Sequence, residues 1–191
     1  PDLRAHGQSA APHDPAAYPG DVLVRDAMAL VETLGLSDYD LCGFSLGART
    51  ATRAVLTGLT PRKLVLGGMG IEGLGNWARR SAFFVGAIDR FDEIKHGDPA
   101  FNARAFMRSQ KVDLVATRLL LQSVDDTSPD ALQGVTMPTM VLCGADDQDN
   151  GSAPSLAAAL PHARYVEIPG THMSSVTRPE MGDAIVVFLT S

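Results

Sequence analysis

With 191 residues, 45% of them apolar, the chain is long enough to bury the core of one domain of ordinary size. Its formal net charge of -6 and its scattered Lys and Arg argue against nucleic acid as a partner. No apolar run approaches the roughly 20 residues that span a bilayer, and no signal-peptide pattern opens the chain, so we expect a cytoplasmic protein without a membrane partner.

The first third of the chain predicts a helix, a strand, a second helix and a second strand. Residues 21–35 carry apolar side chains at helical spacing, with Asp21 as the candidate N-cap. Residues 39–44 and 63–67 are short apolar runs with the length of buried parallel strands. The small residues of 46–57, between these strands, predict a closely packed helix.

The middle of the chain, residues 71–134, predicts helices and no strand. Helical patterns cover residues 76–89, 99–109 and 113–124, and Asp98 is a candidate N-cap for the second helix, which would begin at its proline. Most of the Phe residues and the only Trp lie in this insert. We expect it to cap the carboxyl edge of the sheet, although apolar stripes at helical spacing usually form a helical core of their own.

Strands and helices alternate again toward the end of the chain. Apolar runs at residues 139–144 and 164–168 predict two more strands, and residues 155–160 and 179–189 predict two more helices. This alternation implies an α/β fold with a parallel sheet of about four strands and helices on both faces.

The expected domain organisation follows from these elements. Residues 1–70 and 135–191 would form the α/β core, and residues 71–134 the helical cap insert. Cys42 and Cys143 both lie inside apolar runs, which is typical of small buried residues and not of a disulfide or a metal site.

One serine stands between two glycines where a strand is expected to meet a helix. The segment Gly43-Phe44-Ser45-Leu46-Gly47 matches G-x-S-x-G, in which the glycines leave room for a strained turn that exposes the serine hydroxyl. The pattern alone is weak because it also arises by chance. A serine hydroxyl becomes an effective nucleophile only when an imidazole accepts its proton and a carboxylate orients that imidazole.

Candidate acids and a candidate base follow the last two expected strands. Asp146, Asp147 and Asp149 come after the third strand, and His172 comes after the fourth. Functional groups of a doubly wound sheet gather beyond the carboxyl ends of its strands, so these side chains are expected near Ser45. The order serine, acid, histidine is the one that accompanies a G-x-S-x-G turn.

The chain resembles the α/β-hydrolase fold family, many members of which are serine esterases. The resemblance rests on four motifs in the family's order, which cover nearly the whole chain outside the insert. These motifs are Asp2-Leu3-Arg4-Ala5-His6-Gly7-Gln8-Ser9, Gly43-Phe44-Ser45-Leu46-Gly47, residues 138–147 and Pro169-Gly170-Thr171-His172. Ala5 stands where glycine is commoner in the family.

The resemblance implies a role for each matching residue. Ser45 would be the nucleophile, His172 the general base and then general acid, and Asp147 the orienting acid, with its two aspartate neighbours left open. One oxyanion-hole donor would be the backbone N–H of Leu46, and no cofactor or metal is expected. Four residues are expected to contact the substrate: Phe44, Met69, Trp77 and Phe83.

The resemblance begins only at the end of the family's fourth strand. The earlier strands, and the loop that supplies the second oxyanion donor, have no counterpart in this sequence. Loss of one such donor typically lowers turnover about 10²- to 10³-fold. We therefore expect this chain alone to be nearly inactive, with residues 39–44 as an apolar edge strand.

Two other segments of the sequence resemble binding motifs. Residues 68–73 match the dinucleotide pattern G-x-G-x-x-G, but no second apolar strand ends in an acidic residue about 20 positions later. The aspartates after the third strand lack the closing Glu of a calcium loop. The remaining histidines lie in polar or loop segments and are expected to be solvated, namely His6, His13, His96 and His162.

The sequence therefore predicts a serine hydrolase that cleaves an ester or related acyl bond of a small apolar substrate through an acyl-enzyme. Two alternatives stay open: a non-catalytic binding module of the same fold, and a cofactor-free haloperoxidase or acyltransferase that uses the same triad. The identity of the substrate and the oligomeric state are not predicted.

Overall fold

The computed structural model describes residues 1–191, which form two compact units. The first unit comprises Pro1–Asp26 and Asn76–Asp126, and the second comprises Ala27–Gly75 and Thr127–Ser191. Helix α1 (Val22–Thr33) begins in the first unit and ends in the second. The predicted division into a core and a cap insert stays a prediction.

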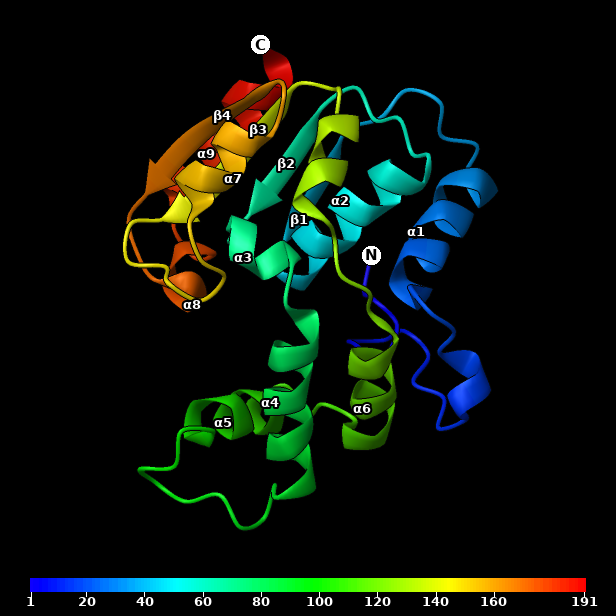
Figure 1. Ribbon diagram of the computed structural model, residues 1–191, viewed down its shortest axis with the longest axis vertical. Coiled ribbons are helices and arrows are strands. Elements are labelled where there is room, and N and C mark those ends of the chain that lie inside the picture. Colours follow the sequence, from blue (N-terminus) through cyan, green and yellow to red (C-terminus); the bar gives the residue numbers. More distant parts are fainter. The chain divides into compact units, whose positions relative to one another are not determined.

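The second unit is built on a parallel sheet of four strands in the order β1-β2-β3-β4 (Figure 1). The strands are β1 (Leu41–Phe44), β2 (Leu64–Gly67), β3 (Thr139–Gly144) and β4 (Ala163–Ile168). The predicted α/β fold with about four parallel strands is confirmed. Since β1 starts two residues later than expected, the edge strand is short.

Helices cover both faces of this sheet. Leu64 and Leu66 of β2 point to one face and pack in a core with residues of α2 and α7, whereas Val65 points to the other face and packs with α9. In Figure 1, α7 and α9 lie on opposite sides of the strands. The helical elements of this unit are α2 (Leu46–Thr57), α3 (Ile71–Leu74), η2 (Pro129–Gly134), α7 (Ala153–Ala159), α8 (His172–Ser175) and α9 (Pro179–Thr190).

The first unit is helical and has an apolar cluster of its own, centred on Ala87, Ile94, Ala100 and Met107. Its elements, besides the start of α1, are η1 (Pro15–Ala17), α4 (Trp77–Asp89), α5 (Phe101–Ser109) and α6 (Leu114–Ser123). The predicted start of α5 at its proline is wrong. Asp98 instead accepts a hydrogen bond from the Ala100 N–H at 2.8 Å, which closes a turn just before the helix.

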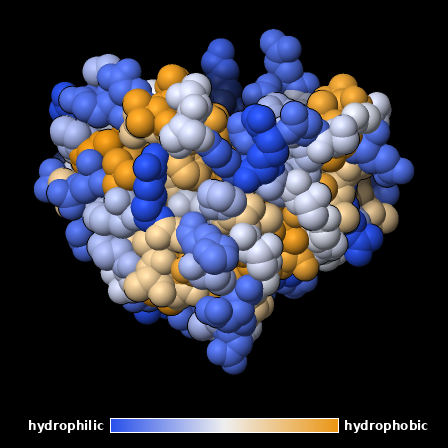
Figure 2. Space-filling model, turned by 90° about the horizontal axis from the view of Figure 1, so that it is seen from above, coloured by the Kyte–Doolittle hydropathy of each residue, from blue (hydrophilic) through white to orange (hydrophobic).

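The two cysteines differ in exposure. Cys143 is buried in the sheet as predicted, but the expectation that Cys42 is buried is wrong, because Cys42 lies on the edge strand β1 and is exposed. Both thiols are free. Apolar side chains also reach the surface elsewhere, and the face in Figure 2 shows them interspersed with hydrophilic ones. No helix combines the length and the apolar character that a bilayer crossing requires.

Candidate active site

Ser45 occupies a strained turn between β1 and α2. Its backbone has φ 52° and ψ -113°, a region that residues other than glycine rarely adopt. The turn is held by the Ser45 N–H, which donates to the Gly67 carbonyl at 2.8 Å, and by the Ser45 carbonyl, which accepts from the Arg49 N–H at 3.0 Å. Gly43 makes the turn possible, because a Cβ there would lie 2.6 Å from the Ala48 nitrogen.

The structure brings Ser45, His172 and Asp147 into one hydrogen-bonded line. The Ser45 Oγ lies 3.0 Å from His172 Nε2, and His172 Nδ1 lies 2.8 Å from Asp147 Oδ2. The histidine and aspartate side chains are only 9% and 1% exposed. Of the three candidate acids, Asp147 is the one that contacts the imidazole; Asp146 is exposed, and the backbone N–H of Asp149 donates to Asp147 Oδ1 at 3.0 Å.

The chemistry of the partners fixes the direction of these hydrogen bonds. An ionised carboxylate only accepts, so Nδ1 of His172 carries the proton that faces Asp147. Nε2 of the neutral ring is then an acceptor and receives the Ser45 hydroxyl proton. The arrangement can therefore move a proton from the serine to the imidazole while the carboxylate stabilises the resulting positive charge.

Cys143, at the end of β3, adds a donor that the sequence did not reveal. Its Sγ lies 3.4 Å from Asp147 Oδ2, the oxygen that also accepts from His172. Burial, and then the negative charge of Asp147, raise the pKa of the Cys143 thiol to about 12. The thiol therefore keeps its proton near neutral pH and donates it to the buried carboxylate.

His172 is placed by the loop that follows β4. It is the first residue of the four-residue helix α8, and Thr171 caps this helix through reciprocal hydrogen bonds with Ser174. The ring of Phe44 lies 4.9 Å from the His172 ring, measured between centroids. A helix of four residues is too short for a hydrophobic period, which explains why α8 was not predicted.

Leu46 opens α2 directly after Ser45. The first N–H groups of a helix have no acceptor within the helix, so the Leu46 N–H is available beside the serine hydroxyl. Its predicted role as an oxyanion donor stays a prediction.

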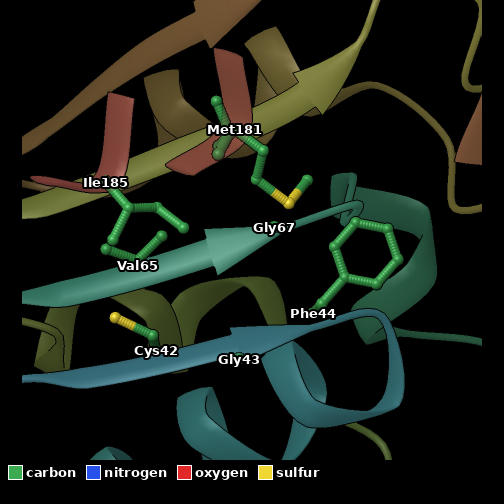
Figure 3. Close-up of a pocket in the computed structure, with 8 residues that line it drawn as sticks. Cys42, Gly43, Phe44, Val65, Gly67, Met181 and Ile185 are labelled. Atoms are coloured by element: carbon green, nitrogen blue, oxygen red, sulfur yellow. The ribbon is translucent and has the colours of Figure 1, made fainter. Parts of the chain in front are cut away.

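An apolar hollow of about 180 Å³ borders the site beside Phe44 (Figure 3). It lies between β1, β2 and α9, with Met181 and Ile185 of α9 facing the two strands. None of its lining side chains is charged. The lining residues are Cys42, Gly43, Phe44, Val65, Gly67, Leu142, Met181 and Ile185.

The other residues predicted to contact substrate lie elsewhere in the two units. Met69 is 2% exposed and belongs to the core of the second unit. In the first unit, the indole N–H of Trp77 donates to the Leu121 carbonyl at 2.8 Å, and Phe83 is exposed with its ring edge-on to Phe84. Their contacts with a substrate stay predictions.

Residues 68–73, the G-x-G-x-x-G match, are not arranged to bind a phosphate. The N–H groups of Gly68, Ile71 and Gly73 donate to carbonyls of Leu142, Ser152 and Asn150, at 2.8, 3.2 and 2.9 Å. A phosphate loop needs such N–H groups free to point at the ligand. This geometry supports the rejection of a dinucleotide site.

Comparison with known proteins agrees with the observed fold. Among solved structures, the chain is similar to an esterase from Exiguobacterium antarcticum, with a TM-score of 0.75 and 19% identity over 100% of this chain and 80% of that one. A bromoperoxidase from Bacillus anthracis matches with a TM-score of 0.71 and 21% identity, over 100% and 80% of the two chains. An enol-lactonase from Burkholderia xenovorans matches with a TM-score of 0.71 and 23% identity, over 100% and 79%.

At these identities the solved structures establish the fold and not the substrate. The family model described as "Alpha/beta hydrolase family" matches residues 1–182, which is nearly the whole chain. The chain therefore belongs to the alpha/beta hydrolase family.

Proposed function

We propose that the protein is a serine hydrolase that cleaves an ester or related acyl bond of a small apolar substrate. The observation that carries this proposal is the continuous line of hydrogen bonds from Ser45 Oγ through the His172 ring to Asp147. Three side chains far apart in the sequence meet in the order that nucleophilic acyl transfer requires.

In the first half of the reaction, His172 Nε2 takes the hydroxyl proton as Ser45 Oγ attacks the substrate carbonyl carbon. The hydrogen bond from Nδ1 to Asp147 at 2.8 Å stabilises the imidazolium that forms. The negative oxygen of the tetrahedral intermediate would be stabilised by the Leu46 N–H. Return of the proton from Nε2 to the leaving group then releases the alcohol and leaves an acyl group on Ser45.

The second half repeats these steps with water in place of the serine. His172 Nε2 takes a proton from water, the hydroxide attacks the acyl carbon, and the proton returns to Ser45 Oγ as the acid product leaves. The Phe44 ring and the uncharged hollow beside it support an apolar substrate, because they offer it no ionic partner.

The nucleophile is tested by covalent labelling of the protein. A fluorophosphonate should attach to Ser45, and Ser45→Ala should abolish labelling, because the probe reacts only with an activated serine hydroxyl. No labelling, or equal labelling of Ser45→Ala, would overturn the proposal and favour a binding module.

The acid is tested by a matched pair of variants in one loop. Asp147→Asn should lower the turnover of short aryl esters by about 10⁴-fold, because the amide cannot hold the productive tautomer of His172. Asp146→Asn, an exposed neighbour, should retain wild-type turnover. Equal losses in the two variants would contradict the assignment of Asp147.

A further inference from the structure

The three motif glycines of the glycine segment, residues 68–73, lie against His172 or against the loop that carries Asp147. A Cβ on Gly68 would lie 3.0 Å from the Cε1 atom of His172, and one on Gly70 would lie 2.6 Å from the Asn150 carbonyl oxygen. A Cβ on Gly73 would lie 2.8 Å from the Asn150 Cβ. Real Cβ atoms essentially never approach other atoms within 3.0 Å, so glycine at positions 70 and 73 permits the close approach of this segment to Asn150.

The partner of this segment is the acid loop, residues 145–152, which carries Asp147 between β3 and α7. The two are joined by backbone hydrogen bonds, with the N–H groups of Ile71 and Gly73 donating to the carbonyls of Ser152 and Asn150. A side chain of the glycine segment adds another, since Glu72 Oε2 accepts from the Ser152 N–H at 2.8 Å.

The most buried of these links comes from the Asn150 side chain. Its Nδ2 donates to the Gly68 carbonyl at 2.7 Å, and the residue is 5% exposed. Asn150 follows Asp147 by three residues, and Gly68 packs against the His172 ring. One hydrogen bond therefore ties the loop that carries the acid to the segment that contacts the base.

We propose that Asn150 is a positioning residue for the Ser45–His172–Asp147 triad, because its carboxamide fixes the acid loop on the glycine segment. This inference rests on the proposed function. Without the tie, the acid loop would keep its backbone and Glu72 links to the glycine segment and the bond from the Asp146 N–H to the Gly170 carbonyl, but it would lose its most buried link. A freer carboxylate would hold the His172 ring less firmly, and a misplacement of about 1 Å can cost 10²-fold in rate.

The first test compares two residues of the acid loop. Asn150→Ala should lower kcat by about 10- to 100-fold with little change in KM, because the buried Asn150 side chain would act on the geometry of the triad. Asn150→Asp, which is nearly isosteric, should also lower kcat, because its carboxylate faces the Gly68 carbonyl without a donor. Gln148→Ala, at an exposed position of the same loop, should leave kcat unchanged.

A second readout separates positioning from general stability. The Nδ1 proton of His172 should give a low-field proton NMR signal that reports the bond to Asp147, and this signal should shift or broaden in Asn150→Ala. Circular dichroism would show whether each variant is folded at the temperature used. If folded Asn150→Ala keeps the wild-type signal, Asn150 is only structural and the proposal fails.

A second pair of variants keeps the test available if the Asn150 variants do not fold. Gly70→Ala would push the glycine segment away from the acid loop, whereas nothing lies within 4 Å of a Cβ on Gly75. Gly70→Ala should reproduce the loss of kcat and the changed NMR signal, and Gly75→Ala should not. Wild-type behaviour of Gly70→Ala would contradict the proposal.

Failure of the proposed function would look different. In that case the wild type would show no turnover that depends on Ser45, yet the His172 signal would still report whether Asn150 positions Asp147. An unchanged signal in folded Asn150→Ala would overturn the positioning role whatever the activity of the wild type.

Discussion

Gly43 and Gly47, which flank Ser45 in the G-x-S-x-G segment, should respond in opposite ways to alanine. A Cβ on Gly43 would lie 2.6 Å from the Ala48 nitrogen and closer still to the Gly47 carbonyl group, whereas ordinary contacts begin at 3.4 Å. These obstacles are backbone atoms of α2, which cannot rotate away as a flexible side chain can. A Cβ on Gly47 meets nothing within 4 Å.

The size of the effect follows from the space that is missing. In Gly43→Ala the first turn of α2 must retreat by about 1 Å, a displacement that typically lowers an enzymatic rate about 10²-fold. The Ser45 Oγ to His172 Nε2 distance of 3.0 Å would then exceed hydrogen-bond range. Overpacking of this kind costs about 1 to 3 kcal/mol of stability. Gly47→Ala should instead stabilise α2 by up to about 1 kcal/mol, because alanine favours a helix over glycine.

Two measurements test this contrast. The rate of fluorophosphonate labelling reports the reactivity of Ser45, and urea unfolding followed by circular dichroism reports stability. Wild-type reactivity and stability in Gly43→Ala would show that the turn relaxes without moving Ser45. Losses in Gly47→Ala as large as those in Gly43→Ala would show that the two glycines act through chain flexibility and not through space.

Two further predictions concern single ionisable side chains, an aspartate that caps a helix and the two cysteine thiols. Asp113→Ala removes the cap that accepts the Ala116 N–H at 3.0 Å and should lower the free energy of unfolding by about 1 kcal/mol at pH 7. The Ala116 N–H, and then the His13 side chain, hold the pKa of Asp113 below its usual value. The contribution of Asp113 to the free energy of unfolding should therefore be present above the unfolded-state pKa of about 4 and vanish as the pH falls through the lower folded-state pKa. Urea unfolding measured at several pH values from 7 down to 2 would reveal this loss. A difference between wild type and variant that persists at pH 2 would contradict this origin. Separately, a disulfide exchange reagent should modify exposed Cys42 in the folded chain and reach Cys143 only after unfolding, because Cys143 is buried with a pKa raised to about 12. Rapid modification of both thiols in the folded chain would refute the burial of Cys143.

Much of the sheet could be predicted from the sequence because buried parallel strands appear as short, continuous apolar runs. The run at residues 139–144 was predicted with the bounds of β3, and the start of the next strand was missed by one residue. Prediction was less accurate at β1, where Tyr39 and Asp40 lie outside the strand. At an edge, only one neighbour supplies hydrogen bonds, so apolar pattern alone does not define where the strand begins.

Some residues of the candidate site could be predicted from the sequence and others could not. Ser45, Asp147 and His172 were predicted because each follows a strand within a recognisable motif, and the structure brings their side chains into contact. Cys143 and Asn150 were missed because only the folded structure shows their contacts, which join Cys143 Sγ to Asp147 Oδ2 and Asn150 Nδ2 to the Gly68 carbonyl. A cysteine in an apolar strand and an asparagine in a polar loop carry no local pattern that distinguishes these contacts from ordinary packing.

The strained backbone of Ser45 is expected to lower the stability of the fold while it places the hydroxyl for the proposed chemistry. At φ 52° and ψ -113° the residue stores about 1 to 3 kcal/mol of conformational strain, which glycine would not carry. Selection of a variant library for heat resistance alone should therefore enrich Ser45→Gly, whereas selection for turnover should eliminate it. In this turn, the hydroxyl that carries out the proposed chemistry is retained at the expense of a more relaxed chain.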